Sequence, residues 1–133
     1  MSIDPHSLAP LVEIPKICVL DDETLEQLRE VDDGGLGFTE EMLGIFETDS
    51  PPRLQALSEA IASQNLNKIA EVAHAFKGSA GTIGAMRTRA FAALLEAYAR
   101  GHEAGTPPGE LFDCLKCAYQ EARDALKSHI VAG

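Results

Sequence analysis

The sequence predicts an all-α protein, an antiparallel four-helix bundle with a short extra N-terminal helix and an extended N-terminal arm. Four substantial segments place apolar residues at helical spacing, and the connections between them are short, which is typical of a bundle. No segment alternates apolar and polar residues or carries a two-residue hairpin turn, so no sheet is expected. The 133 residues suffice for one hydrophobic core. We therefore expect an arm over residues 1–20 and one bundle domain over residues 21–133.

Three prolines at five-residue spacing mark the N-terminal arm: Pro5, Pro10 and Pro15. Each fixes φ and lacks a backbone donor, so a regular helix is not expected there. A short helix should follow over about 22–31, with Asp21 or Asp22 supplying the N-cap oxygen. The glycine-rich stretch after it is a turn by composition.

The first long helix is expected to begin at Thr39, whose hydroxyl has the chemistry of an N-cap. Glu40 and Glu41 follow in the first turn, where the helix dipole favours negative charge. The apolar stripe of this helix resumes after Pro51 and Pro52. Two prolines within one pattern indicate either two helices or one long helix with a bend, and we favour the bent helix.

Three more helices are expected, over about 65–80, 85–100 and 109–129. A Gly-Thr-Ile-Gly corner at 81–84 separates the first two of these. The stretch after residue 100, rich in glycine and proline, is a loop that leads into the last helix.

The net charge argues against a nucleic-acid binder. The chain has 21 acidic and 11 basic residues and a formal charge of −10, whereas phosphate-backbone affinity needs concentrated Lys and Arg. Residues 1–64 hold 14 acids and 3 bases, and residues 65–133 hold 7 acids and 8 bases, so an anion fits the second half better. No apolar run suits a membrane helix and the start does not resemble a signal peptide. We expect a cytoplasmic monomer with no membrane contact.

The helix over 65–80 carries an exposed histidine. Six apolar residues share one arc of its helical wheel: Leu66, Ile69, Val72, Ala73, Phe76 and Ala80. His74 lies about 140° from the centre of that arc, and Gly78 lies nearly opposite the arc. Lys77 lies at the border, so its stem can follow apolar surface while its ammonium group reaches the face of His74.

This pattern predicts a covalent nucleophile that works between two macromolecules. An exposed imidazole, with an ordinary pKa near 6.5, is largely neutral at cytoplasmic pH, so a ring nitrogen can attack phosphorus. Lys77 would offset the charge of the transferred group. Glycine within a helix costs about 1 kcal/mol relative to alanine, and Gly78 with Gly81 leaves the backbone bare for a partner to approach. Since Glu71 is a single carboxylate near His74, a metal would have to come from the partner.

Competing interpretations of other motifs are weaker. Cys114 and Cys117 resemble half of a zinc site, but no second Cys/His pair is spaced to complete it, so we predict no metal site and expect one of these thiols to face the core. The Lys77-Gly78-Ser79 string is no P-loop, because that motif follows a strand and places its lysine after glycine. His6, His102 and His129 have no such context.

At residues 73–85 the sequence AHAFKGSAGTIGA resembles the signature of histidine-containing phosphotransfer (HPt) domains. That signature has a His, a Lys-Gly-Ser three residues later and a Gly-Ala corner. The segment FETDSP at 46–51 and the pair Leu95-Glu96 resemble two further family features, and the likeness covers about residues 20–128. Thr88, Phe91-Ala92 and Phe76 depart from the usual packing residues.

The resemblance implies a phosphorelay carrier. His74 would be phosphorylated, with Lys77 as electrostatic support and Gly78 as the gap that admits a receiver domain. The partners would be the receiver domains of a hybrid histidine kinase and of a response regulator, each supplying an aspartate and Mg²⁺, so the chain would be a stoichiometric carrier and not an enzyme.

Secondary contacts are also expected near the histidine. Ser79 either bonds locally or touches the phosphoryl group, and Gly81 extends the bare surface. Arg87 and Arg89 have the charge needed to dock an aspartate-rich receiver. The alternative function is a non-catalytic helical interaction module, which the presence of His74 with Lys77 and Gly78 disfavours.

Overall fold

A computed structural model describes residues 14–102 and 105–132 of the chain, and every regular element in these ranges is helical. The elements are η1 (Ile14–Lys16), α2 (Asp22–Val31), α3 (Gly37–Ala62), α4 (Leu66–Thr82), α5 (Met86–Ala99) and α6 (Pro108–Ala132). This order agrees with the prediction of a short helix followed by four longer ones. Within the same ranges, no helix combines the length and hydrophobicity that crossing a membrane requires.

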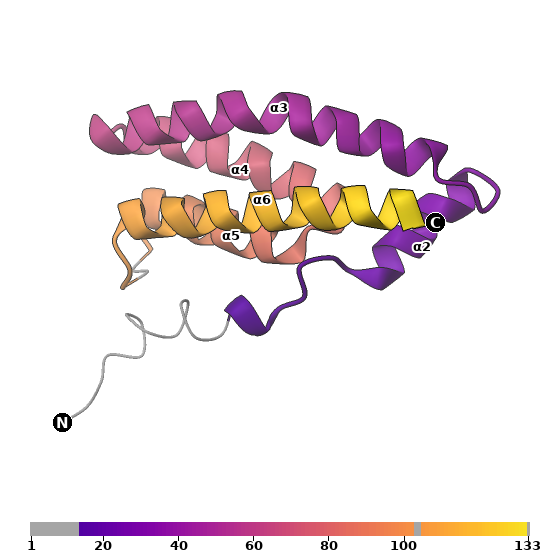
Figure 1. The fold of residues 1–133 in the computed structure, drawn as a ribbon. Coiled ribbons are helices and arrows are strands. Elements are labelled where there is room, and N and C mark those ends of the chain that lie inside the picture. Colours follow the sequence, from indigo (N-terminus) through magenta and orange to yellow (C-terminus); the bar gives the residue numbers. More distant parts are fainter. Residues whose placement is uncertain (1–13, 103–104, 133) are drawn as a thin grey trace.

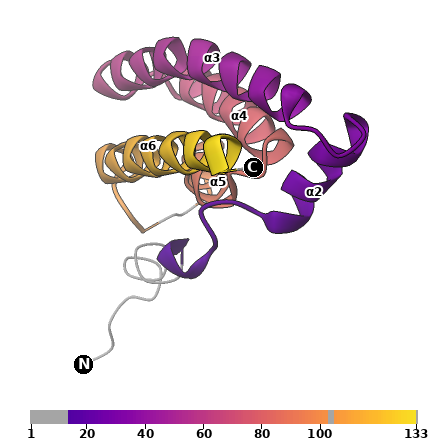
Figure 2. The same ribbon diagram turned by 45° about the vertical axis from the view of Figure 1, so that its right-hand side comes forward.

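The four long helices lie side by side as a bundle (Figures 1 and 2). α4 packs against α3 and α5, and α6 packs against the same two helices from the other side. α2 crosses one end of the bundle beside the start of α3, and η1 packs against α5. The outer face of α4 is exposed at Glu71, His74 and Gly78.

The core is centred on three aromatic rings from three helices. Phe46 on α3, Phe76 on α4 and Tyr119 on α6 meet edge to face, with ring centroids 5.1–6.4 Å apart. Each ring is nearly or fully buried, and such pairs stabilise beyond their buried area. Five of the six residues in the arc predicted for α4 are buried, whereas Leu66, at the exposed start of the helix, is 45% exposed.

The two predicted N-caps have different outcomes. Asp21 caps α2 by accepting a hydrogen bond from the Thr24 backbone N–H at 3.1 Å, and Asn65 caps α4 through the Lys68 N–H at 3.1 Å. The predicted N-cap at Thr39 is wrong. α3 starts two residues earlier, at Gly37, and Thr39 is fully buried, so its side chain packs inward instead of capping.

α3 passes through both prolines as one helix, which supports the single-helix alternative. Pro51 and Pro52 are exposed, so water can solvate the turn that loses two backbone donors. Ser50, immediately before them, is fully buried and keeps this turn against the core.

The described part of the arm is anchored. Ile14, in η1, is buried and belongs to the same hydrophobic cluster as the bundle helices. The rest of the expected arm, including Pro5 and Pro10, lies outside the described residues. The division into an arm over 1–20 and a domain over 21–133 stays a prediction.

Candidate functional site

His74 projects from the outer face of α4. Its neighbours Ala73 and Phe76 are fully buried, and this fixes the rotation of the helix about its axis. The His74 side chain is consequently 64% exposed, as the helical wheel predicts.

A buried carboxylate from α5 holds this imidazole. Nδ1 of His74 lies 2.9 Å from Oε2 of Glu96, and Nζ of Lys77 donates to Oε1 of Glu96 at 2.6 Å. Arg100 donates to the same Oε2 through Nε at 3.1 Å and Nη2 at 2.9 Å. Glu96 is 7% exposed, so four N–H donors from three side chains converge on one desolvated anion.

These contacts keep Glu96 ionised. The hydrogen bond from Lys77 lowers the pKa of Glu96 most, those from Arg100 and His74 lower it further, and burial opposes them; the result is a pKa of about 2. An ionised carboxylate only accepts hydrogen bonds. In neutral His74 the proton is therefore assigned to Nδ1, and Nε2 keeps its lone pair.

A bare surface lies beside the histidine. A Cβ added to Gly78 would have no atom within 4 Å. The prediction that Gly81 extends this bare surface is wrong, because the Arg89 side chain covers it and an added Cβ would lie 3.3 Å from Cδ of Arg89. An open depression of about 460 Å³ covers this region, and its lining residues are Lys77, Gly78, Gly81, Thr82, Met86 and Arg89. Another protein can thus approach the helix backbone next to His74, in a positively charged setting.

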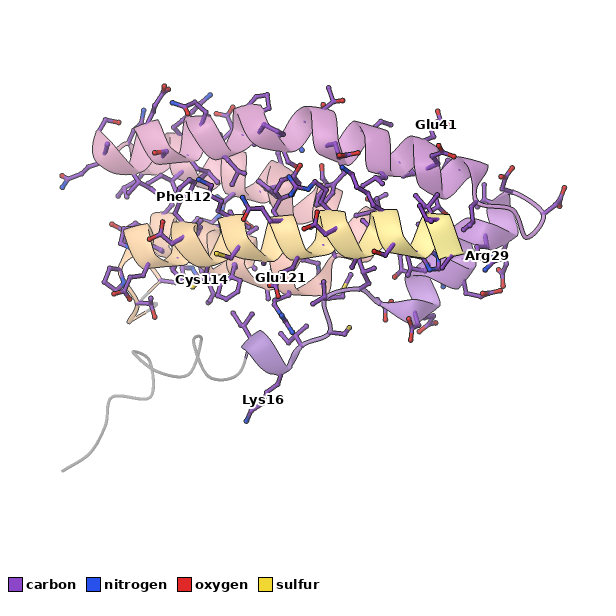
Figure 3. The ribbon with its side chains drawn as sticks, in the orientation of Figure 1. Lys16, Arg29, Glu41, Phe112, Cys114 and Glu121 are labelled. Atoms are coloured by element: carbon purple, nitrogen blue, oxygen red, sulfur yellow. The ribbon has the colours of Figure 1, made fainter. Side chains whose placement is uncertain are left out.

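Two of the predicted binding residues, Ser79 and Arg87, contact other helices. Ser79 is engaged by α3, because Nη1 of Arg53 donates to its hydroxyl oxygen at 2.7 Å. Arg87 reaches Glu121 on α6 at 3.2 Å and the carbonyl oxygen of Ile17 at 3.2 Å; Figure 3 labels Glu121 on α6. The structure brings Arg89 into the depression near His74, and it does not bring Arg87 there.

The cysteines do not form a recognisable site. Cys114, on α6 (Figure 3), is half-buried, and burial raises the pKa of its thiol, whereas Cys117 is exposed. The expectation that one of the two thiols faces the core is met by Cys114, which packs against the core cluster. Within 14–102 and 105–132, no three His, Cys, Asp or Glu side chains are grouped as a metal would require. His102 is exposed and His129 half-buried, while His6 is outside the described residues.

Sequence reasoning missed the parts played by Glu96 and Arg100, although a signal for both existed. On α5, Glu96 takes a position of the buried stripe with Ala92 and Leu95. An acidic residue at an apolar helix position needs a cationic partner, and Arg100, one turn later, is the local candidate.

Comparison with known proteins agrees with this geometry. The model of the Hpt domain family matches residues 41–127. Histidine-containing phosphotransfer protein 4 of Arabidopsis thaliana is 30% identical over 116 residues, which cover 84% of this chain and 89% of that protein. The crystal structure of histidine-containing phosphotransfer protein B (HptB) from Pseudomonas aeruginosa PAO1 matches with a TM-score of 0.75 and 25% identity, over 88% of this chain and 98% of the other.

The matched segment contains α4 and α5 in full, together with the histidine, the lysine and the buried carboxylate described above. By the shared family signature and the shared fold, the chain belongs to the Hpt domain family.

Proposed function

We propose that this protein is the histidine phosphotransfer component of a phosphorelay, in which His74 takes a phosphoryl group from the aspartate of one receiver domain and yields it to another. The donor would be the receiver of a hybrid histidine kinase and the acceptor that of a response regulator. Family membership supports a phosphotransfer role in two-component signalling. The observation that carries the proposal is the exposed imidazole whose Nδ1 is held by Glu96.

The transfer step follows from the assigned tautomer. Nε2 of His74 attacks phosphorus as the bond from phosphorus to the aspartate oxygen breaks, and the aspartate leaves as a carboxylate. No proton has to be removed first, because Nε2 carries none. The ring gains positive charge as the Nε2–P bond forms, and the Glu96 carboxylate, 2.9 Å from Nδ1, stabilises that charge. The reverse step returns the electron pair to Nε2.

Lys77 would support the charge of the phosphoryl group, and Gly78 would give the receiver access. The Lys77 side chain is 30% exposed and lies one turn from His74, so its ammonium group can shift from Glu96 toward the arriving phosphoryl oxygens. Gly78 leaves room for the receiver's active site to reach Nε2. Mg²⁺ would be held by the receiver's carboxylates, as is usual where phosphoryl transfer needs charge neutralisation, and the chain would act as a stoichiometric carrier.

Transfer from a purified phosphorylated receiver domain tests this proposal. Incubation with Mg²⁺ should place an acid-labile, base-stable phosphate on the peptide that contains His74. The His74→Gln variant should take up no label while keeping its helical content, and His102→Gln, a change to an exposed histidine, should label like the parent. Label retained in His74→Gln would overturn the proposal. A parent chain that binds receivers and never labels would instead favour the interaction module.

A further inference from the structure

Arg100 shares a carboxylate oxygen with the histidine. Its guanidinium group donates twice to Oε2 of Glu96, the atom that faces Nδ1 of His74. Arg100 is the C-cap residue of α5, and its backbone N–H bonds to the Glu96 carbonyl oxygen. Because helical side chains lean toward the N-terminus, this position directs Arg100 back one turn onto Glu96.

The local helix end favours this arrangement. A glutamate that precedes an arginine by four residues is the favourable order for an ion pair on a helix, and a cation suits the negative end of the helix dipole. Gly101, at φ +87°, ends the helix immediately afterwards, since that conformation is strained for other residues. The contact is thus built into the end of α5.

The charges around His74 explain what Arg100 can do. On α4, Lys77 contacts Glu96 and Glu71 pairs with Lys68. Glu96 on α5 contacts the ring, Arg100 at the end of α5 contacts Glu96, and α3 contributes Arg53, which is bonded to Ser79. Glu96 carries one negative charge, while Lys77 and Arg100 carry two positive ones. Glu96 favours a proton on the imidazole and the two cations oppose it.

We propose that Arg100 is a positioning residue for His74. Arg100 fixes the Glu96 carboxylate oxygen that accepts the Nδ1 hydrogen bond, and it offsets the negative charge of that carboxylate so that the imidazole stays neutral and nucleophilic. This rests on the proposed role of His74. Two effects follow from the loss of Arg100. First, the Glu96 carboxylate loses two of its four hydrogen-bond donors and can rotate. Second, the imidazolium form of His74 gains stability, because the cation next to the Glu96 carboxylate has been removed.

Nuclear magnetic resonance of ¹⁵N-histidine-labelled protein measures both effects without a receiver. In Arg100→Ala, the pH midpoint of the His74 titration should rise by about half a unit to one unit, the size expected for one partly screened charge at close range. The ¹⁵N shifts of the neutral ring should also show a smaller excess of the Nδ1–H tautomer. Arg100→Lys should restore most of the midpoint and less of the tautomer preference, because an ammonium group cannot reproduce the forked contact.

Arg123→Ala is the matched control, because it removes the same charge from α6, where Arg123 contacts Asp124 and the Tyr119 ring. Its His74 titration should match the parent. His74→Gln identifies the resonance, and circular dichroism checks that each variant is folded. A titration and tautomer ratio in Arg100→Ala equal to those of the parent would overturn the inference. If His74 labels normally with phosphate in that case, the proposed function stands without the role of Arg100.

Discussion

The α4–α5 pair and the α3–α6 pair use opposite chemistry within one bundle. Between α4 and α5 a buried carboxylate joins two cations and an imidazole, and the helix surface beside them is bare at Gly78. Between α3 and α6 the buried contact from Phe46 to Tyr119, at 5.1 Å between ring centroids, is aromatic, and the ion pair of Lys127 with Glu47 lies nearer the surface. The first pair places two cations beside a bare surface, and the second pair contributes aromatic packing to the core.

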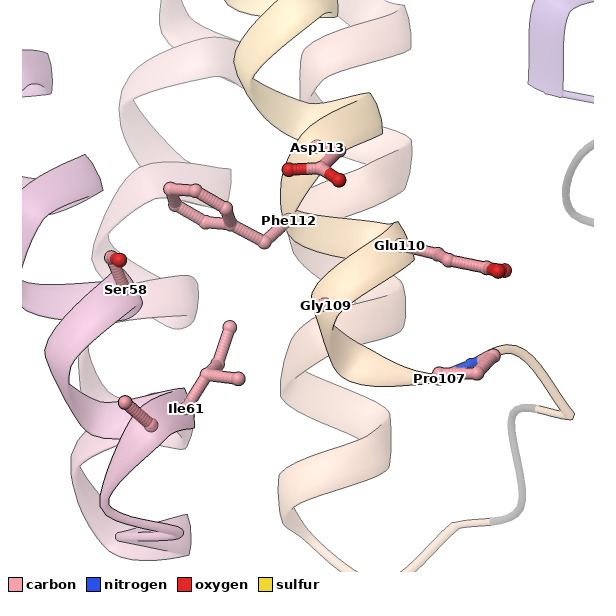
Figure 4. A pocket seen from close by; sticks show the side chains of 8 residues that line it. Ser58, Ile61, Pro107, Gly109, Glu110, Phe112 and Asp113 are labelled. Carbon is pink, nitrogen blue, oxygen red and sulfur yellow. The ribbon is translucent and has the colours of Figure 1, made fainter.

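The surface depressions beside the two helix pairs also differ in the charge of the residues that line them. A depression of about 520 Å³ lies between α3 and α6, where Ser58, Ile61 and Phe112 face one another (Figure 4). Glu110 and Asp113, both acids, lie at its edge. The smaller depression near His74 contains Lys77 and Arg89. The residues that line the larger hollow therefore lack the positive charge that an acidic partner needs, and size alone does not identify the proposed site.

The largest expected effect on function comes from filling the bare surface. Gly78→Phe should reduce phosphotransfer at least a hundredfold, because the ring would occupy the space that a receiver enters. Stability should stay equal or rise by about 0.5 kcal/mol, since the added Cβ meets no atom within 4 Å and phenylalanine is a better helix former than glycine.

Transfer kinetics and thermal unfolding together test this expectation. Gly109→Phe is the control, because it also adds a ring in open space, at the start of α6 and away from the site. Transfer by Gly78→Phe at the rate of Gly109→Phe would refute the role of the bare surface.

Phe46→Ala should lower stability and leave phosphotransfer nearly unchanged, the reverse of Gly78→Phe. The ring is 2% exposed and contacts the rings of Phe76 and Tyr119, so its loss should cost about 3–5 kcal/mol of unfolding free energy. Below the unfolding transition, the transfer rate should stay within about twofold of the parent. Phe46→Leu, which leaves a smaller cavity, keeps the test available if the alanine variant does not fold. A folded variant with a large transfer defect would mean that the two regions are not separable.

Lys77→Ala should affect both phosphotransfer and stability. Transfer should fall about tenfold, which corresponds to about 1.4 kcal/mol of transition-state stabilisation. Because Lys77 is the main cause of the low pKa of Glu96, the variant should also be less stable at neutral pH. The stability that comes from a lowered carboxylate pKa is present above its unfolded value of 4.5 and is lost as pH falls toward about 2.

The difference in unfolding free energy between the parent and Lys77→Ala should therefore become smaller as the pH falls from about 4.5 toward about 2. Urea unfolding at several pH values measures it. A difference that is constant between pH 2 and pH 5, with unchanged transfer, would assign Lys77 a packing role.

Charge reversal at two arginines should give the smallest effects. Arg89→Glu should slow transfer a few-fold at low salt, with the difference shrinking at high salt, because Arg89 lines the depression next to Gly78. Arg87→Glu should leave transfer unchanged and lower stability by about 1 kcal/mol, since it places an acid opposite Glu121. Equal transfer defects in the two variants would contradict the separation that the structure makes between them.

The sequence predicted the helices and the outward direction of His74 well, because both depend on local periodicity. α2 has the predicted bounds, and α4 ends two residues after the prediction. The grouping of Glu96 with His74 was not predictable from spacing, because it depends on how α4 and α5 are rotated against each other. Arg87 and Arg89 could have been separated, since residues two apart on a helix point about 200° from each other.

The position of phosphorus on the imidazole ring tests the proposed role of His74 most directly. Phosphorus-31 and nitrogen-15 spectra of the phosphorylated, ¹⁵N-histidine-labelled chain distinguish the two nitrogens of each histidine. We expect phosphorus on Nε2 of His74, because Glu96 occupies the Nδ1 side. Phosphorus on Nδ1, or on His102 or His129, would contradict it.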